Sequence, residues 1–172
     1  MNLSDLLNEA TICCPLVSNS RNGAIQELLN HLFSLDILSG TIKLFTNINE
    51  QEKLFTSSTG RGVAYPHSTS MEIKDLKCVL GVSKRGIDFN SPDGHGCHLI
   101  LLTLSPFNEP KNHRKFITRF RLMVDDPMIR SNLLDSNNLF DVIDKLTKLY
   151  PNNVTTNSQH GVNDIKKIYN VF

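Results

Sequence analysis

The chain has 172 residues, a net charge of +1 and 40% hydrophobic residues, which suits one domain with a substantial core. A charge balance this close to neutral favours neither nucleic-acid binding nor attraction to a membrane surface. No apolar run approaches the roughly 20 residues that a membrane-spanning helix needs, and the first residues lack the basic and then apolar order of a secretory signal.

The first predicted elements are two helices. Apolar side chains recur at helical spacing over residues 21–33, and Ser20 precedes them as a suitable N-cap. Thr46 is a possible cap for a second, shorter helix that ends near Leu54.

A glycine-rich turn and a short strand follow. Gly60 and Gly62 allow the backbone to turn tightly, and residues 63–65 then form a short apolar strand. Pro66 ends this strand because it fixes its own backbone angle and restricts the residue before it. We therefore expect His67 to lie just past the end of the strand.

Two longer extended segments are expected next. Residues 77–83 have the composition of a strand, and residues 86–89 form a short extended piece. A strong turn signal at residues 91–94 leads to the nearly continuous apolar run of residues 97–104. Such a run predicts a central strand that is buried on both faces.

The C-terminal part of the chain is predicted to be helical. Asn108 caps a helix with Pro110 in its first turn, and this helix continues to about residue 124. Helices are also expected after Asp126-Pro127, up to about residue 134, and over residues 139–149. Strands and helices alternate, which predicts a single α/β domain over residues 1–150, with a mixed β-sheet flanked by α-helices. Residues 151–172 are expected to form a polar linker and tail, with a last helical turn within residues 164–172.

Cysteine usage indicates a reducing compartment, and the cytoplasm is the simplest location. The chain has no CxxC pair, so free thiols are expected. The cluster His95, Cys97 and His98 fits no standard zinc spacing and is interpreted as strand and turn residues, so no metal site is predicted.

His67 is the first candidate for chemistry. It follows a rigid turn and a hydroxyl-rich segment that contains Thr56 and Ser57, and reactive groups often lie on loops that a scaffold holds in place. A reactive nucleophile and a solvated turn histidine are both compatible with this local pattern.

His113 is the second candidate, in the first turn of the predicted 108–124 helix. It shares a face with the apolar positions of that helix, and a helix N-terminus stabilises anions such as a phosphoryl group. A structural, partly buried histidine is the alternative. The same helix is basic, which indicates either a solvated face or a surface for phosphate or for an acidic partner; its basic residues are Lys111, Arg114, Lys115, Arg119 and Arg121.

Three ordered segments resemble one family. Residues 51–67, QEKLFTSSTGRGVAYPH, are similar to the family segment REKLGSTGIGNGVAIPH. Residues 86–94 and 98–106 are similar in order and spacing to GIDFDAxDGxPVHLIFLL-xP, and the helix that begins at His113 is similar to HLxLLAxLAxLL. The chain thus resembles the enzyme IIA components of the bacterial phosphoenolpyruvate-dependent phosphotransferase system, mannitol/fructose class, and in particular their nitrogen-related regulatory members.

The resemblance implies roles for individual residues. His67 would accept a phosphoryl group from the phosphocarrier protein HPr or its nitrogen-class relative, and His113 would assist. The family arginine that is thought to hold the phosphoryl group is Gln51 here, and Arg61 or Arg114 is a possible substitute. Hydroxyl groups near the site are further candidate donors: Thr56, Ser57 and Ser68.

Three functions remain open at this stage. The first is a regulator whose phosphorylation state sets its affinity for protein partners. The second is a carbohydrate-transport IIA component that passes phosphate to a IIB cysteine. The third is a binding module that is not phosphorylated, because Gln51 replaces the arginine. In the first two the protein is a phosphotransferase component rather than a free-standing enzyme, and no cofactor is required.

Overall fold

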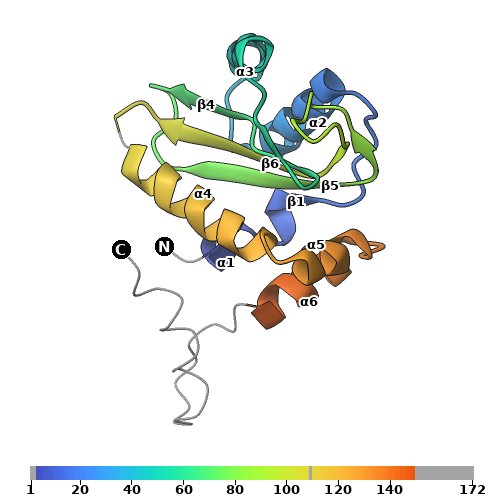
Figure 1. Ribbon diagram of the computed structural model, residues 1–172. Coiled ribbons are helices and arrows are strands. Elements are labelled where there is room, and N and C mark those ends of the chain that lie inside the picture. Colours follow the sequence, from blue (N-terminus) through green and yellow to red (C-terminus); the bar gives the residue numbers. More distant parts are fainter. Residues whose placement is uncertain (1–2, 109, 150–172) are drawn as a thin grey trace, which may run out of the picture.

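A computed structural model describes residues 3–108 and 110–149, and it has a mixed β-sheet between two layers of helices (Figure 1). Six strands form one sheet in the order β1-β5-β6-β3-β2, and β4 also pairs with β6. The strands are β1 (Ile12–Cys13), β2 (Ser58–Gly60), β3 (Val63–Ala64), β4 (His67–Ser70), β5 (Lys77–Ile87) and β6 (Cys97–Pro106). The predicted α/β class with a mixed sheet is confirmed.

The helices divide between the two faces of the sheet. Figure 1 shows α2 and α3 on one face and α4, α5 and α6 on the other. The helical elements are α1 (Leu3–Leu6), a 3-10 turn η1 (Glu9–Thr11), α2 (Arg21–Ser34), α3 (Ile42–Leu54), α4 (Pro110–Val124), α5 (Pro127–Leu134) and α6 (Leu139–Leu149). None of the helices in the described ranges is long and apolar enough to span a membrane.

The central strand β6 contributes to two apolar layers. Ile100 and Leu102 pack with residues of α2 and α3, whereas Leu99 and Leu101 pack with residues of α4. Successive side chains of a strand point to opposite faces, so this alternation follows directly from the apolar run in the sequence. The prediction of a strand buried on both faces is confirmed.

The predicted helices are present, but one start is wrong, and Asn108, the expected cap of α4, lies two residues before its first residue, Pro110. Ser20 caps α2 as expected, since its hydroxyl accepts a hydrogen bond from the Gly23 backbone. The second helix begins at Ile42, so the predicted start at Thr46 is wrong. Thr46 lies inside α3, and its hydroxyl donates to the carbonyl of Ile42 at 3.0 Å, the internal bond that threonine forms in a helix.

The strand predictions need two corrections. His67 follows the short strand β3 as expected, after Tyr65 and Pro66, but it also begins a further strand, β4, that was not predicted. The break between β3 and β4 arises because proline has no N–H for the ladder, and pairing with β6 then resumes. The segment predicted to end at residue 83 continues without interruption to Ile87 in β5. Residues 150–172, including the predicted linker and its last helical turn, lie outside the described residues.

Candidate functional site

His67 is placed by the pairing of β4 with β6. The two strands are parallel, and His67 is in register with Thr103. The backbone N–H of Thr103 donates to the carbonyl of Pro66 at 3.0 Å, which anchors the chain immediately before His67. The His67 side chain is exposed and lies on the face of the sheet that α4 covers.

His113 comes to the same point from α4. It lies in the first turn of this helix, which begins just beyond the end of β6. Phe116 and Phe120 of α4 are buried against the sheet, so the helix position is determined by its apolar face. The ring centroids of His67 and His113 are 5.5 Å apart, with an angle of 35° between the ring planes. The structure thus brings together the two histidines that the sequence singles out.

The hydrogen bonding of His67 determines its neutral tautomer. Its Nδ1 lies 3.2 Å from the backbone carbonyl of Tyr65. A carbonyl oxygen only accepts hydrogen bonds, so Nδ1 carries the proton. In the neutral ring Nε2 then has a free electron pair, which makes it the nucleophilic atom.

His113 is half-buried and bonded to a fully buried threonine. Its Nε2 lies 2.9 Å from the hydroxyl oxygen of Thr103. Burial, and to a smaller extent the nearby charge of His67, lowers the pKa of His113. Both causes disfavour the imidazolium, so the neutral ring is favoured in the absence of an anion. Thr103 was not predicted as a site residue, although its hydroxyl within the apolar run of residues 97–104 was an available signal.

The start of α4 provides an environment for an anion. The first turn of a helix has free backbone N–H groups and the positive end of the helix dipole. Arg114 and Lys111 flank His113 and both are exposed. A phosphoryl group on His67 would therefore lie beside the positive end of this helix, whose first turn and a half also carries two exposed cationic residues.

The hydroxyl-rich segment before the glycine turn is partly occupied by structural bonds. The Thr56 hydroxyl donates to the Phe89 carbonyl and accepts from the backbone of Ser58. The Ser57 backbone N–H donates to the carboxylate of buried Glu52 at 3.1 Å. Within the described part of the chain, the Ser57 hydroxyl oxygen is buried and has no hydrogen-bond partner. Of the two candidate hydroxyls, that of Thr56 is thus committed to structural bonds and that of Ser57 is not.

Ser68 differs from its neighbour His67. Its side chain is 1% exposed, and alternation along β4 directs it to the opposite face of the sheet. Its hydroxyl donates to the carbonyl of Thr69 at 3.5 Å. The structure therefore does not bring the Ser68 hydroxyl to the face that carries the two histidines.

The three residues proposed to hold phosphate lie in different places. Gln51 is exposed in the last turn of α3, and its carbonyl accepts from the C-cap residue of that helix. Arg61 forms an exposed ion pair with Asp125 at 2.9 Å, one residue beyond the end of α4. Asp125 is about 18 Å along the helix axis from His113 at 1.5 Å per residue. Arg114 is the candidate adjacent to His113 in the chain.

The glycine turn is held by a carboxylate from the β5–β6 connection. Gly60, Arg61 and Gly62 all have positive φ angles, of 84°, 57° and 76°. Asp93 accepts a hydrogen bond from the Arg61 backbone at 2.6 Å and one from the Ser91 hydroxyl, also at 2.6 Å. These bonds fix the turn from which the chain runs to His67.

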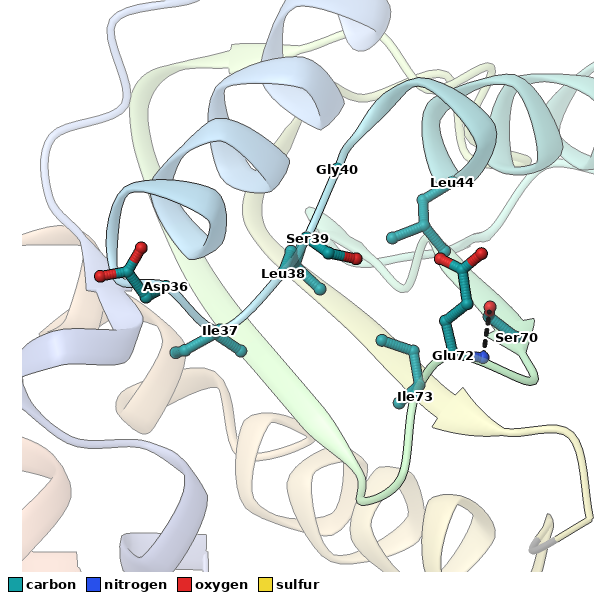
Figure 2. A pocket seen from close by; sticks show the side chains of 9 residues that line it. All are labelled: Asp36, Ile37, Leu38, Ser39, Gly40, Leu44, Ser70, Glu72 and Ile73. Carbon is teal, nitrogen blue, oxygen red and sulfur yellow. Dashed lines mark hydrogen bonds between the residues drawn. The ribbon is translucent and has the colours of Figure 1, made fainter.

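A separate cavity lies on the other face of the sheet. Its volume is about 420 Å³, and it opens between the α2–α3 connection and the end of β4 (Figure 2). Leu38, Leu44 and Ile73 line it, together with Ser70 and Glu72. Figure 2 shows the Asp36 carboxylate directed away from these side chains. Neither histidine of the candidate site lines this cavity.

Comparison with known proteins agrees with this architecture. The family described as "Phosphoenolpyruvate-dependent sugar phosphotransferase system, EIIA 2" matches residues 5–167. The nitrogen regulatory protein of Bradyrhizobium diazoefficiens is 30% identical over 133 residues, which cover 77% of this chain and 86% of that protein. The fructose-specific EIIABC component of Bacillus subtilis is 24% identical over 144 residues, 84% of this chain, and the chain spans only 23% of that protein.

Solved structures show the same fold. The nitrogen regulatory protein IIA-Ntr from Neisseria meningitidis aligns with a TM-score of 0.74 at 24% identity, over 83% of this chain and 97% of that chain. The IIA mannitol structure from Escherichia coli aligns with a TM-score of 0.70 at 19% identity, over 81% of this chain and 98% of that chain. Since the family match covers residues 5–167, the chain belongs to the EIIA 2 family of the phosphoenolpyruvate-dependent sugar phosphotransferase system.

Proposed function

We propose that this phosphocarrier-type protein accepts a phosphoryl group from an HPr-type phosphohistidine on Nε2 of His67, and that its phosphorylation state regulates a protein partner in the cytoplasm. The observation that carries this proposal is the pair of imidazole rings 5.5 Å apart at the N-terminus of α4. The similarity to nitrogen regulatory proteins supports the regulatory role.

The transfer uses groups that are already in place. The electron pair of His67 Nε2 forms a bond to phosphorus while the nitrogen–phosphorus bond of the donor breaks. The electron pair of the broken bond returns to the nitrogen of the donor ring. The proton on Nδ1 stays on the ring and keeps its bond to the Tyr65 carbonyl. Catalysis of such a transfer is mostly positioning and stabilisation of the negative charge on the phosphoryl oxygens. The helix N-terminus and His113 supply that stabilisation, and Arg114, next to His113 in the chain, is the candidate cation.

Large apolar side chains are exposed just after β4, β6 and α3. Phe55 and Phe107 are 83% and 67% exposed, and Met71 is 89% exposed. Met71 and Phe107 directly follow β4 and β6, which are paired to their ends. Exposed apolar side chains of this size are typical of protein interfaces.

A second candidate function is phosphate transfer to a IIB cysteine. The solved structures with this fold include a complex of enzyme IIAMTL and phosphorylated enzyme IIBMTL from Escherichia coli. A non-phosphorylated binding module is the third, because Gln51 offers no positive charge. Stoichiometric transfer of phosphate from this protein to a IIB protein would favour the second, and absence of acid-labile phosphate would favour the third.

The decisive experiment is incubation with phosphoenolpyruvate, enzyme I and HPr, or with their nitrogen-class relatives. We expect one acid-labile phosphate per chain, which disappears in His67→Ala and remains in His95→Ala, the matched change at an exposed histidine. His113→Ala should slow labelling on the order of 100-fold, as removal of one transition-state donor does, without abolishing it. Full labelling of His67→Ala would overturn the site.

A further inference from the structure

Thr103 connects the two histidines of the site. Its backbone N–H donates to the Pro66 carbonyl immediately before His67, and its hydroxyl bonds to His113 Nε2 at 2.9 Å. Thr103 is also the residue of β6 that is in register with His67. One residue of the central strand therefore contacts both chain segments that form the site.

The hydroxyl of Thr103 lies in apolar surroundings. Thr103 is fully buried, and its register partner on the other side, Cys78, is 2% exposed. Leu101, two residues earlier on the same face, is also fully buried. A valine would fill this space with a similar shape and without a polar group, whereas a buried hydroxyl requires a partner. Its bond to His113 is therefore the feature that distinguishes threonine from valine here.

The direction of this bond determines the tautomer of His113. A threonine hydroxyl either donates or accepts, and a neutral imidazole has one N–H. With Nε2 bonded to Thr103, the nitrogen that is left for a phosphoryl oxygen is Nδ1. Nδ1 donates to that oxygen only if it carries the proton, and this requires Nε2 to accept the proton of the Thr103 hydroxyl.

We propose that Thr103 is a positioning residue for phosphoryl transfer: its hydroxyl donates to Nε2 of His113 and holds this ring as the Nδ1–H tautomer, ready to donate to the phosphoryl group on His67. This inference rests on the proposed function. When the phosphoryl dianion is present, the neighbouring negative charge favours the imidazolium form of His113. Nε2 then carries a proton too, and it donates a hydrogen bond to the oxygen of the Thr103 hydroxyl, which rotates about its C–O bond to accept this bond.

The test compares Thr103→Val, which removes the hydroxyl, with Thr103→Ser, which keeps it. The tautomer of His113 is read from ring ¹⁵N chemical shifts of the full chain at neutral pH, and the labelling rate is measured with enzyme I, HPr and phosphoenolpyruvate. We expect an Nδ1–H ring in the wild type and in Thr103→Ser, and a mixture of tautomers in Thr103→Val. Labelling of Thr103→Val should be about tenfold slower, the factor that one hydrogen bond contributes. Ser105→Ala, which removes another buried hydroxyl from the same face of β6, should leave the tautomer unchanged.

An Nε2–H tautomer of His113 in the wild type would overturn the proposal, and this result requires no variant to fold. A pure Nδ1–H ring in Thr103→Val would also overturn it. If the wild-type chain takes no phosphate, the proposed function fails, but the ¹⁵N shifts still decide whether Thr103 sets the tautomer of His113.

Discussion

The rings of His67 and His113 lie 5.5 Å apart although one residue belongs to the sheet and the other to a helix that packs on it. At this distance a charge on one ring disfavours a charge on the other, and His67 contributes to the lowered pKa of His113. The free site therefore disfavours the imidazolium form of His113, and a dianionic phosphoryl group would reverse this preference.

The pH dependence of stability should report on His113. Its pKa lies below the ordinary value of 6.5 in the folded protein, so the unfolded chain binds more protons just below that value. The free energy of unfolding should therefore fall as the pH falls through about 6.5, and this loss should stop below the folded pKa. His113→Gln should show a smaller difference between urea unfolding at pH 7.5 and at pH 5.5.

The control for this measurement is His95→Gln, because His95 is an exposed histidine of the β5–β6 connection. Its pH dependence should match that of the wild type. If the free energy of unfolding changes equally with pH in the wild type and in His113→Gln, His113 has the same pKa in the folded and unfolded states.

Restoring an arginine at position 51 should strengthen phosphate retention. Gln51 is exposed in the last turn of α3, so the longer side chain can be accommodated there without burying its charge. Charge-assisted hydrogen bonds are about twice as strong as neutral ones, which corresponds to a gain of roughly tenfold in the lifetime of the phosphohistidine. The measurement is the rate of phosphate loss at neutral pH from labelled wild type and Gln51→Arg. An unchanged lifetime would indicate that another cation already serves the site.

Arg114 and Arg61 should behave differently in the same assay. Arg114→Ala should shorten the lifetime of the phosphohistidine because it removes a cation next to His113. Arg61→Ala should leave it unchanged, since Arg61 pairs with Asp125 at the opposite end of α4. Loss of that exposed ion pair should change the free energy of unfolding by no more than about 1 kcal/mol. A shorter lifetime in Arg61→Ala alone would reverse this assignment.

The sequence predicted the elements with strong periodicity and missed those that depend on pairing. Helix α2 and strand β6 have a clear apolar pattern, and both were predicted nearly to their ends. Strand β4 was missed because its residues, HSTS, are polar and its pairing with β6 is a tertiary contact. The hydroxyl of Thr103 stands out within the apolar run, but its bond to His113 could not be predicted, since only register and helix packing bring the two side chains together. The separation of Arg61 from the histidines likewise follows from the direction of α4.

Asp93 should make the protein sensitive to acid. Hydrogen bonds from the Ser91 hydroxyl and from the backbones of Arg61 and His95 lower its pKa from 3.8 to about 2. The carboxylate form therefore stabilises the fold above the ordinary pKa, and this contribution is lost as the pH falls from about 4 toward 2. Asp93→Asn should be less stable than the wild type at pH 6, and the difference should shrink toward pH 2. Asp75→Asn, an exposed change on the β4–β5 connection, is the control; a constant difference between Asp93→Asn and the wild type would contradict the prediction.

Phe55 should act on partner binding and not on folding. Phe55 is the first residue after α3, two residues before Ser57. The Tyr65 N–H donates to the Ser57 carbonyl, so this segment lies beside the segment that leads to His67. The side chain is 83% exposed, so Phe55→Ser should change the free energy of unfolding by less than about 0.5 kcal/mol. Truncation of an aromatic anchor typically weakens a protein interface by more than about 1 kcal/mol, so the KM for the HPr-type donor should rise about tenfold at an unchanged kcat.

Val17→Ser is the control, because it removes an equally exposed apolar side chain, at 87% exposure, near the start of α2; it should leave both KM and kcat unchanged. If the KM of Phe55→Ser equals that of the wild type, the donor protein does not use this side chain, and Phe107 or Met71 becomes the next residue to truncate.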